Sequence, residues 1–240
     1  MSPKRNPSTG MDAARREVAR NRTVFEALGN GRRGQEMDQG VGNYYLTDEI
    51  ENRNFERFLS LTQERGNSIL DVACGDGVET EVLVDRGFEV TAFDFSANLV
   101  AQTAQRLKGI GRKATLYVDD VTDLRRDRYG SHFAGVMFAQ AACFVPIVDK
   151  KDSLMRKVID DLASTTSEGV FYYSTTWYDD PRYQRVWGVG DDRVGTTTLY
   201  ARPADTVAEM LTDTGLEVVH SDHFDAGPGK YKNDYLIAVR

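Results

Sequence analysis

The sequence has little cysteine and no long hydrophobic run. Its 240 residues include two cysteines, Cys74 and Cys143, which lie in unrelated contexts. Two thiols exclude a disulfide framework and a zinc cluster built on thiolates, and unpaired thiols are typical of a reducing compartment. No apolar stretch approaches the roughly 18 to 20 residues that a membrane-spanning helix needs, and the polar N-terminus lacks the apolar centre of a signal peptide. We therefore expect a soluble cytoplasmic protein without a membrane partner.

Positive charge is scarce outside the N-terminal segment. The chain carries a net charge of −7, whereas residues 1–33 hold eight Lys or Arg against three Asp or Glu, a local +5 that leaves −12 for the remainder. An acidic body repels phosphate backbones, so nucleic acid is disfavoured as a partner. The basic segment is interpreted as a solvated or partner-binding helix, with a nucleic-acid tail as the alternative.

From residue 67 onward, apolar runs alternate with helix-forming segments. The pattern predicts seven strands, at residues 68–73, 88–94, 114–118, 133–138, 169–175, 216–224 and 234–239. Helices are predicted at 78–87, 97–107, 151–163 and 203–215, and in the N-terminal part at 11–28 and 48–62. Strands that alternate with helices of this length form right-handed units on a parallel sheet. We expect an α/β fold with a doubly wound, mostly parallel seven-stranded sheet and an antiparallel last strand.

The chain divides into two parts by this pattern. Residues 1–66 are assigned to an N-terminal tail and helical cap or lid, of which the first ten residues are expected to be disordered by composition. Residues 67–240 are assigned to the main domain.

The segment ILDVACGDG, residues 69–77, ends an apolar strand in a glycine-containing turn. Gly75 and Gly77 precede a predicted helix, which is the context of a nucleotide-binding fingerprint, although Thr80 replaces its third glycine. A pyrophosphate on this turn would face Asp71 and Asp76, and like charges about 4 Å apart cost on the order of kilocalories per mole. A ligand with positive charge is favoured instead, and S-adenosylmethionine carries an ammonium and a sulfonium group.

Further carboxylates end the next two predicted strands. Asp94 lies nineteen residues after Gly75, the spacing at which an acid meets a ribose in βαβ nucleotide sites. Asp119 and Asp120 end the third strand, where a carboxylate can accept a hydrogen bond from an adenine amino group. Because the carboxyl ends of parallel strands meet at one edge of a sheet, we expect these acids to line one site.

The motifs DVACGDG, TAFDFS and VDDVTDL, in this order, resemble successive motifs of the class I S-adenosylmethionine-dependent methyltransferases. The resemblance covers about residues 67–240 and implies a Rossmann-like methyltransferase fold with S-adenosyl-L-methionine as cofactor. It implies that the methionine part of the cofactor is surrounded by Asp71, Ala73, Gly75 and Gly77, where Ala73 replaces a glycine of many members. The remaining cofactor contacts are assigned to Asp94 at the ribose, to Phe95, Asp120 and Val121 at the adenine, and to Phe138.

Three segments at the same edge are predicted to build the pocket for the methyl acceptor. They are VGNYYLTDE before the main domain, residues 140–144, and a connection of over twenty residues after the fifth strand that holds both tryptophans. Tyr45, Gln140 and Tyr178, one from each segment, are the candidate catalytic residues. Aromatic residues there suit an apolar or cationic acceptor, and the alternative is that they only cover a hydrophobic sheet face.

The sequence after the fourth strand, FAQAACFVP, lacks the Asn/Asp-Pro-Pro-aromatic motif of enzymes that methylate amino groups in nucleic acids. We therefore expect methyl transfer to a small-molecule O, N or C nucleophile by in-line displacement, with no metal. A tRNA or protein methyltransferase and a non-catalytic S-adenosylmethionine-binding protein are the alternatives. The oligomeric state stays open, with a homodimer as one possibility.

Overall fold

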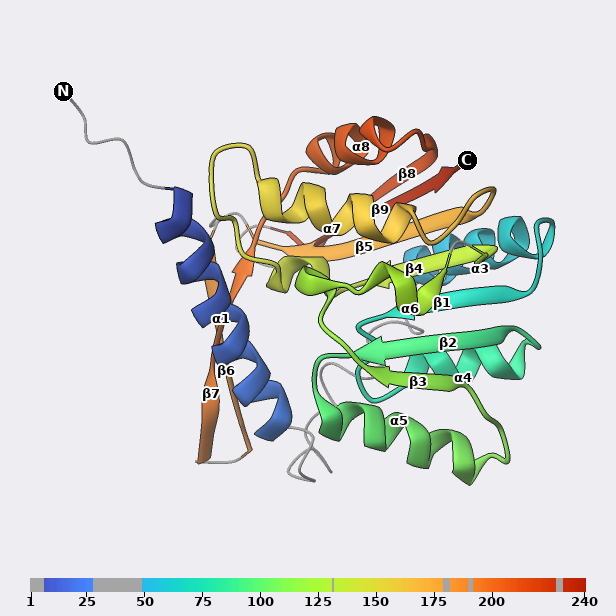
Figure 1. The fold of residues 1–240 in the computed structure, drawn as a ribbon, viewed down its shortest axis with the longest axis horizontal. Helices are drawn as coiled ribbons and strands as arrows, with labels where there is room; N and C mark the ends of the chain where they lie inside the picture. The colour runs from blue at the N-terminus through green and yellow to red at the C-terminus, as the bar shows by residue number, and fades with distance from the viewer. Residues whose placement is uncertain (1–6, 28–48, 131, 179–181, 190–191, 228–230) are drawn as a thin grey trace.

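The computed structural model describes residues 7–27, 49–130, 132–178, 182–189, 192–227 and 231–240. A seven-stranded sheet lies at its centre, with helices on both faces (Figure 1). The strand order is β3-β2-β1-β4-β5-β9-β8. The strands are β1 (Ser68–Val72), β2 (Glu89–Asp94), β3 (Thr115–Val118), β4 (Gly135–Ala139), β5 (Val170–Trp177), β8 (Glu217–Asp225) and β9 (Lys232–Val239). Each lies within two residues of a predicted strand, so the predicted sheet is confirmed.

The direction of the strands gathers the ends of β1 to β5 at one edge of the sheet. β1 pairs in parallel with β2 and β4, and the parallel ladder continues to β3 on one side and to β5 on the other. β9 runs antiparallel to both β5 and β8, as expected for the final hairpin. Loops that follow the parallel strands therefore converge at one edge, which is where ligands bind in open α/β sheets.

Helices cover the two faces of the sheet as two separate hydrophobic clusters. One cluster joins the sheet to α6 (Arg126–Tyr129), α7 (Ser153–Ala163) and α8 (Ala204–Asp213), and the other joins it to α3 (Glu49–Gln63), α4 (Val78–Asp85) and α5 (Ala97–Gly109). Side chains of a strand alternate between its faces. Leu70 therefore packs into the first cluster and its neighbour Ile69 into the second.

Helix α3 belongs to the core. Its Phe58 is 0% exposed, and its ring centroid lies 5.3 Å from that of Tyr172 on β5. The sequence pattern assigns residues 49–63 to the N-terminal cap or lid. The packing instead makes this helix one of the layers that cover the sheet.

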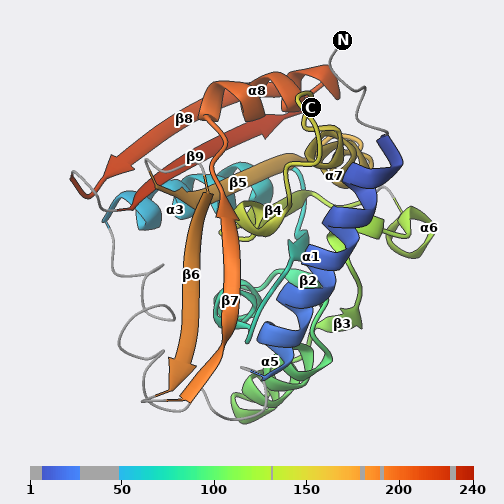
Figure 2. The same cartoon turned by 90° about the vertical axis from the view of Figure 1, so that its left-hand side faces the viewer.

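The N-terminal helix α1 (Pro7–Ala27) lies outside the two layers, beside an additional hairpin (Figure 2). The hairpin consists of β6 (Arg182–Val189) and β7 (Asp192–Tyr200), which pair antiparallel, where the sequence suggested a long loop. Gly195 of β7 lies against α1, since a Cβ atom there would come within 2.5 Å of Val24 Cγ2. The helix begins at Pro7, within the segment expected to be disordered, and together with the hairpin it closes the edge where the loops converge (Figure 2).

Candidate active site

A cavity of about 200 Å³ lies at the carboxyl edge of the sheet. Its walls come from the segments after β1, β2, β3 and β4, from α1, from the short helix η3 (Ala142–Phe144) and from Leu199 of β7. Seven of the nine residues assigned to the cofactor line this cavity: Asp71, Ala73, Gly75, Asp94, Phe95, Asp120 and Val121. The parallel topology thus brings residues that are up to 50 positions apart in the sequence to one place.

The two glycines of the turn after β1 differ in role. Gly75 has a φ of +57° and open space where a Cβ atom would lie, and it lines the cavity. Gly77 has a φ of +84°, and a Cβ atom there would lie 2.6 Å from Thr103 Cγ2. Gly77 therefore allows the start of α4 to approach α5, and it does not itself line the cavity.

Ala73 is held in the left-handed region of backbone space, with a φ of +57°. A Cβ atom makes this conformation unfavourable, which explains why glycine suits the position. Ala73 also lines the cavity. The turn is thus formed at a cost in backbone strain.

Asp94 connects the turn after β1 to the start of α5. Its Oδ2 accepts a hydrogen bond from Gly75 N at 3.2 Å, and its Oδ1 accepts one from Ser96 N at 2.8 Å. Ser96 in turn caps α5, because its Oγ accepts from Leu99 N at 3.3 Å. The carboxylate is 4% exposed and lines the cavity. A carboxylate oxygen can accept more than one hydrogen bond, so this group is chemically suited to the hydroxyls of a ligand.

Asp71 is a buried acid at the end of β1, 2% exposed. Its pKa is raised to about 7, mainly by burial and in smaller part by the charge of Asp94, whereas the hydrogen bond from Thr80 Oγ1 at 2.6 Å opposes the shift. Ionised Asp71 is therefore costly in this site. A cation in the cavity would offset that cost, since it favours the charged form.

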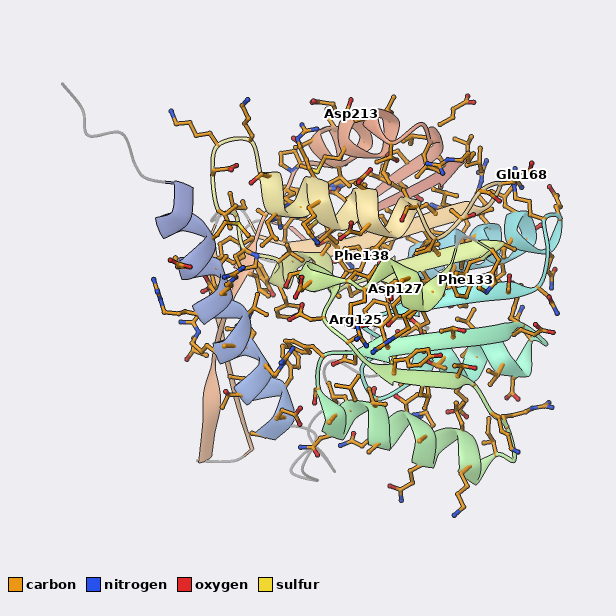
Figure 3. The ribbon with its side chains drawn as sticks, in the orientation of Figure 1. Arg125, Asp127, Phe133, Phe138, Glu168 and Asp213 are labelled. Carbon is orange, nitrogen blue, oxygen red and sulfur yellow. The ribbon has the colours of Figure 1, made fainter. Side chains whose placement is uncertain are left out.

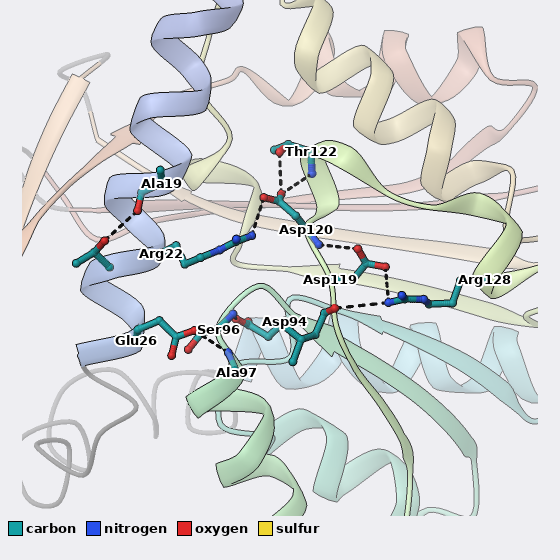
Figure 4. Close-up of polar contacts among 12 residues, drawn as sticks. Ala19, Arg22, Glu26, Asp94, Ser96, Ala97, Asp119, Asp120, Thr122 and Arg128 are labelled. Carbon is teal, nitrogen blue, oxygen red and sulfur yellow. Dashed lines mark hydrogen bonds and ion pairs between the residues drawn. The ribbon is translucent and has the colours of Figure 1, made fainter.

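Asp119 and Asp120 are both engaged by protein groups (Figure 4). Asp119 Oδ2 accepts from Arg128 Nη1 at 3.0 Å and from the Tyr129 hydroxyl at 2.9 Å. Asp120 Oδ1 accepts from Thr122 N at 2.9 Å, and Asp120 Oδ2 accepts from Arg22 Nη2 of α1 at 3.1 Å. The end of β3 is thus tied to the N-terminal helix.

Helix α1 is bound to the site at two further points. The Glu26 carboxylate accepts from Ala97 N at 2.8 Å and from Asn98 N at 3.3 Å, so it supplies an acceptor for the first turn of α5. The Phe25 ring lies 5.6 Å from Phe95 and 5.1 Å from Phe144, centroid to centroid. Phe95 therefore meets α1 on one side of the cavity.

Sequence analysis assigned residues 1–66 to a cap or lid but did not name the side chains of α1 that line the cavity. Three of its side chains line the wall, Val18, Asn21 and Phe25. The signal that could have found them is the loose apolar face of an otherwise basic helix, on which Val18 and Phe25 lie one above the other at a spacing of seven.

The three candidate catalytic residues have different outcomes. Gln140 lines the cavity with a φ of +54°, and its Oε1 lies 2.5 Å from Thr176 Oγ1. Tyr178 follows β5 but is not among the residues that line this cavity. Tyr45 lies outside the described residues.

Phe138 is not placed at the cofactor cavity. It is 0% exposed and packs between the sheet and α7, with its ring 6.2 Å from that of Tyr173 (Figure 3). Its neighbours Met137 and Ala139 line the cavity instead. The reason is the alternation of side chains along β4, which points Phe138 to the opposite face.

Arg202 fixes the wall that follows β4. Its guanidinium is buried, pairs with Asp152, and donates to the carbonyl oxygens of Ala142 at 3.2 Å and Val145 at 2.7 Å. These carbonyls flank η3, whose Cys143 and Phe144 face the cavity. The buried ion pair therefore positions one wall of the site from outside it.

The other reactive side chains have structural surroundings. Burial raises the pKa of the Cys74 thiol well above its usual range, and that of Cys143 to about 11, so both are neutral thiols near neutral pH. His220 bonds Asn54 and His223 bonds Asp234, both away from the cavity. Within the described ranges no group of three His, Cys, Asp or Glu side chains could hold a metal ion. No helix in those ranges is long and apolar enough to cross a membrane.

Comparisons with known proteins agree with this geometry. Residues 69–163 match the family model of a methyltransferase domain. No curated protein matches the sequence significantly. The fold is similar to that of 1,6-didemethyltoxoflavin-N1-methyltransferase from Burkholderia thailandensis, solved with 1,6-didemethyltoxoflavin and S-adenosylhomocysteine. The TM-score is 0.65 at 15% identity, over 100% of this chain and 92% of that one.

A second similar structure is magnesium protoporphyrin IX methyltransferase from Synechocystis, solved with S-adenosylmethionine. Its TM-score is 0.62 at 17% identity, and the likeness covers 100% of both chains. The strand order, the antiparallel β9 and the acid-lined turn define a Rossmann-like methyltransferase fold. The match to the methyltransferase-domain model spans β1 to α7 and so includes all three motifs.

Proposed function

We propose that the protein transfers the methyl group of S-adenosyl-L-methionine to an O, N or C nucleophile of a small molecule. The observation that carries the proposal is the division of the cavity into two parts. The part formed by the ends of β1, β2 and β3 is acidic, and the part formed by α1, η3, β7 and the end of β4 is lined by neutral side chains among the described residues. Such a cavity suits a cationic cofactor beside a separate acceptor.

The residues of the acidic part fit the cofactor. Gly75 leaves open space beside the buried Asp94 carboxylate, which has lone pairs for the ribose hydroxyls. Asp71 and the acids near it favour the ammonium and sulfonium charges. Phe95 and Val121 supply apolar surface for the adenine, with Asp120 at its amino group. Ala73 and Gly75 would adjoin the methionine part.

S-adenosylmethionine, when bound, would supply an electrophilic methyl group to a lone pair of the acceptor, and S-adenosylhomocysteine would be the other product. The protein aligns the acceptor with this bond and keeps water out. Phe25, Phe144 and Leu199 form apolar walls for that purpose. When a neutral amine nitrogen is methylated, the pKa of its N–H group falls, and the proton is lost afterwards. The chain therefore needs no dedicated base for an amine.

A small acceptor is supported by the position of α1. The helix lies across the edge where the loops converge (Figure 2), and it is tied to the segment after β3, to α5 and to β7. We therefore assign α1 the role of a lid over the acceptor. The two similar structures belong to enzymes named for small planar substrates, which agrees with this assignment.

The proposal is tested by calorimetric titration with S-adenosylhomocysteine and by a methyl-transfer assay over O, N and C acceptors of small size. We expect cofactor binding and turnover of small acceptors but not of tRNA or protein. Binding of the cofactor without turnover of any acceptor would favour a non-catalytic protein. Stabilisation by NAD instead of S-adenosylhomocysteine would contradict the cofactor assignment.

A further inference from the structure

Two primary amides line the cavity without a full set of hydrogen bonds. Asn21 of α1 is 1% exposed, and neither its Nδ2 nor its Oδ1 has a partner. Gln140 after β4 is 8% exposed, and its Nε2 has none. Among the described residues these are the only cavity-lining side chains with buried polar atoms that lack a partner.

Such groups are expensive in a folded protein. A buried amide that makes no hydrogen bond costs about 1–3 kcal/mol by the evidence of protein mutations. Helix α1 has no structural need for Asn21, because a leucine of similar size would fill the same position without the penalty. Polar groups of this kind are retained at functional sites, where a ligand completes their hydrogen bonds.

The environment of Gln140 holds one end of its side-chain amide. Thr176 Oγ1 lies 2.5 Å from Gln140 Oε1 and 2.7 Å from Asn233 Oδ1. Asn233 Nδ2 donates in turn to the Tyr235 hydroxyl at 3.2 Å. One end of the Gln140 amide is thus held by a buried chain of hydrogen bonds, and the other end is left for a molecule in the cavity. The left-handed φ of +54° at Gln140 sets the direction of its side chain.

The surroundings of the two amides define the kind of molecule. The described cavity residues from α1, β4, η3, β5 and β7 carry no charge, and most are apolar: Val18, Phe25, Met137, Phe144, Val145 and Leu199. A charged acceptor would lose its hydration here without gaining an ion pair, which is costly. A neutral molecule with an apolar body would be favoured, and aromatic walls suit a flat ring.

We propose that Asn21 and Gln140 bind a neutral, mainly apolar ring compound that carries both a hydrogen-bond donor and a hydrogen-bond acceptor, such as a lactam. The inference rests on the proposed methyl transfer and names the class of its acceptor. Asn21 contributes a donor and an acceptor, and Gln140 contributes the free end of its amide. Both are specificity-determining residues, and α1 therefore takes part in substrate recognition as well as closure.

The experiment uses the full chain saturated with S-adenosylhomocysteine and three bicyclic probes of similar size. The probes are quinolin-2(1H)-one, which is a neutral lactam, 1-naphthoate, which is an anion, and 1-naphthylmethylammonium, which is a cation. Saturation-transfer NMR titrations give the affinity of each. We expect the lactam to bind at least about fivefold more tightly than either ion, and Asn21→Leu and Gln140→Leu each to weaken it at least about fivefold.

The control is Thr166→Val, which removes another buried hydroxyl without a partner at the opposite edge of the sheet. It should leave lactam binding unchanged. Asn21→Leu should also keep or raise the melting temperature, whereas loss of a structural residue would lower it.

The inference is overturned if either ion binds as tightly as the lactam, if the lactam does not bind, or if Asn21→Leu leaves its affinity unchanged. Calorimetry with S-adenosylhomocysteine distinguishes failure of the proposed acceptor class from failure of the proposed function. A parent protein that binds S-adenosylhomocysteine but not the lactam refutes only the acceptor class. A parent protein that does not bind S-adenosylhomocysteine refutes the proposed function itself.

Discussion

Arg22 Nη2 lies 3.1 Å from Asp120 Oδ2, and this ion pair joins the N-terminal helix to the end of β3 (Figure 4). The guanidinium also lies over the ring of Phe95, 5.6 Å from its centroid. Arg22 therefore contacts two of the three residues that are assigned to the adenine of the cofactor. A helix distant in sequence from the cofactor motifs is coupled to them through one side chain.

The first prediction concerns this pair. The Arg22 side chain is 46% exposed, so the pair contributes no more than about 1 kcal/mol. Arg22→Gln should raise the Kd for S-adenosylhomocysteine by less than about fivefold, and the difference should shrink in about 0.5 M salt. Calorimetry at two salt concentrations measures both. Arg112→Gln, which breaks an exposed ion pair with Asp85 away from the cavity, is the control and should leave the Kd unchanged. A large, salt-independent loss would show that Arg22 acts other than as an exposed ion pair.

The second prediction concerns Asp94. Hydrogen bonds to a charged acceptor contribute roughly 1.5–3 kcal/mol each, and water partly replaces them when the acceptor is removed. Asp94→Ala should therefore weaken S-adenosylhomocysteine binding by about 2–4 kcal/mol, or roughly 30- to 1,000-fold. It should also lower the melting temperature, because Gly75 N and Ser96 N lose their acceptor. Asp94→Asn should lose less affinity for S-adenosylhomocysteine, since the amide carbonyl still accepts a hydrogen bond.

The control for Asp94 is Asp161→Ala on α7, which removes another buried carboxylate, bonded to Lys157 Nζ at 2.6 Å. This variant should lose stability and keep cofactor affinity. If folded Asp94→Ala binds within threefold of the parent, roughly 0.6 kcal/mol, Asp94 is only a structural acceptor and the ribose lies elsewhere.

The third prediction concerns the strain at Ala73. Glycine adopts a φ of +57° without the penalty that a Cβ atom brings, and part of this gain is offset by the entropy of glycine in the unfolded chain. Ala73→Gly should stabilise the fold by about 0.5–1 kcal/mol, or about 1–4 °C in Tm. Ala92→Gly, at a buried position of β2, should instead lower the Tm. A lower Tm for Ala73→Gly would mean that the methyl packing outweighs the strain.

The fourth prediction concerns pH. The folded pKa of Asp71 is raised to about 7, so the folded protein retains a proton that the unfolded chain releases near pH 4. The stability from neutral Asp71 is fully present below about pH 4 and is lost as the pH rises to about 7. Asp71→Asn has no carboxyl group to titrate, so it does not lose stability in this way as the pH rises. The difference in Tm between the variant and the parent should therefore favour the variant more at pH 8 than at pH 5, as thermal unfolding at both values would measure. An equal difference at the two values would rule out a raised pKa.

Much of the fold was predictable from local patterns. Each strand of the sheet is a short apolar run between a helix and a turn, and these features repeat along the chain independently of distant contacts. The acids Asp71, Asp94 and Asp120 could be placed together because parallel strands have only one carboxyl edge. Their positions in the cavity follow from that rule alone.

Other features depended on contacts between distant segments. Phe138 was assigned to the site, yet its face of the sheet depends on the register of β4, which one residue of slip would reverse. Gly77 was assigned to the cofactor, but its role depends on how closely α5 approaches. Local sequence patterns predict neither the register of β4 nor the close approach of α5 to the turn at Gly77.

The sequence by itself determined the order of strands and helices, the acidic edge and the class of cofactor, because periodicity and spacing act within a few residues. Only the tertiary structure decided which side chains of α1 and β7 line the cavity, and that Asn21 and Gln140 belong to the same cavity. These two residues are 119 positions apart in the chain. Their common site depends on packing between α1 and the hairpin. Such packing forms only when both surfaces are buried together, so neither segment determines it alone.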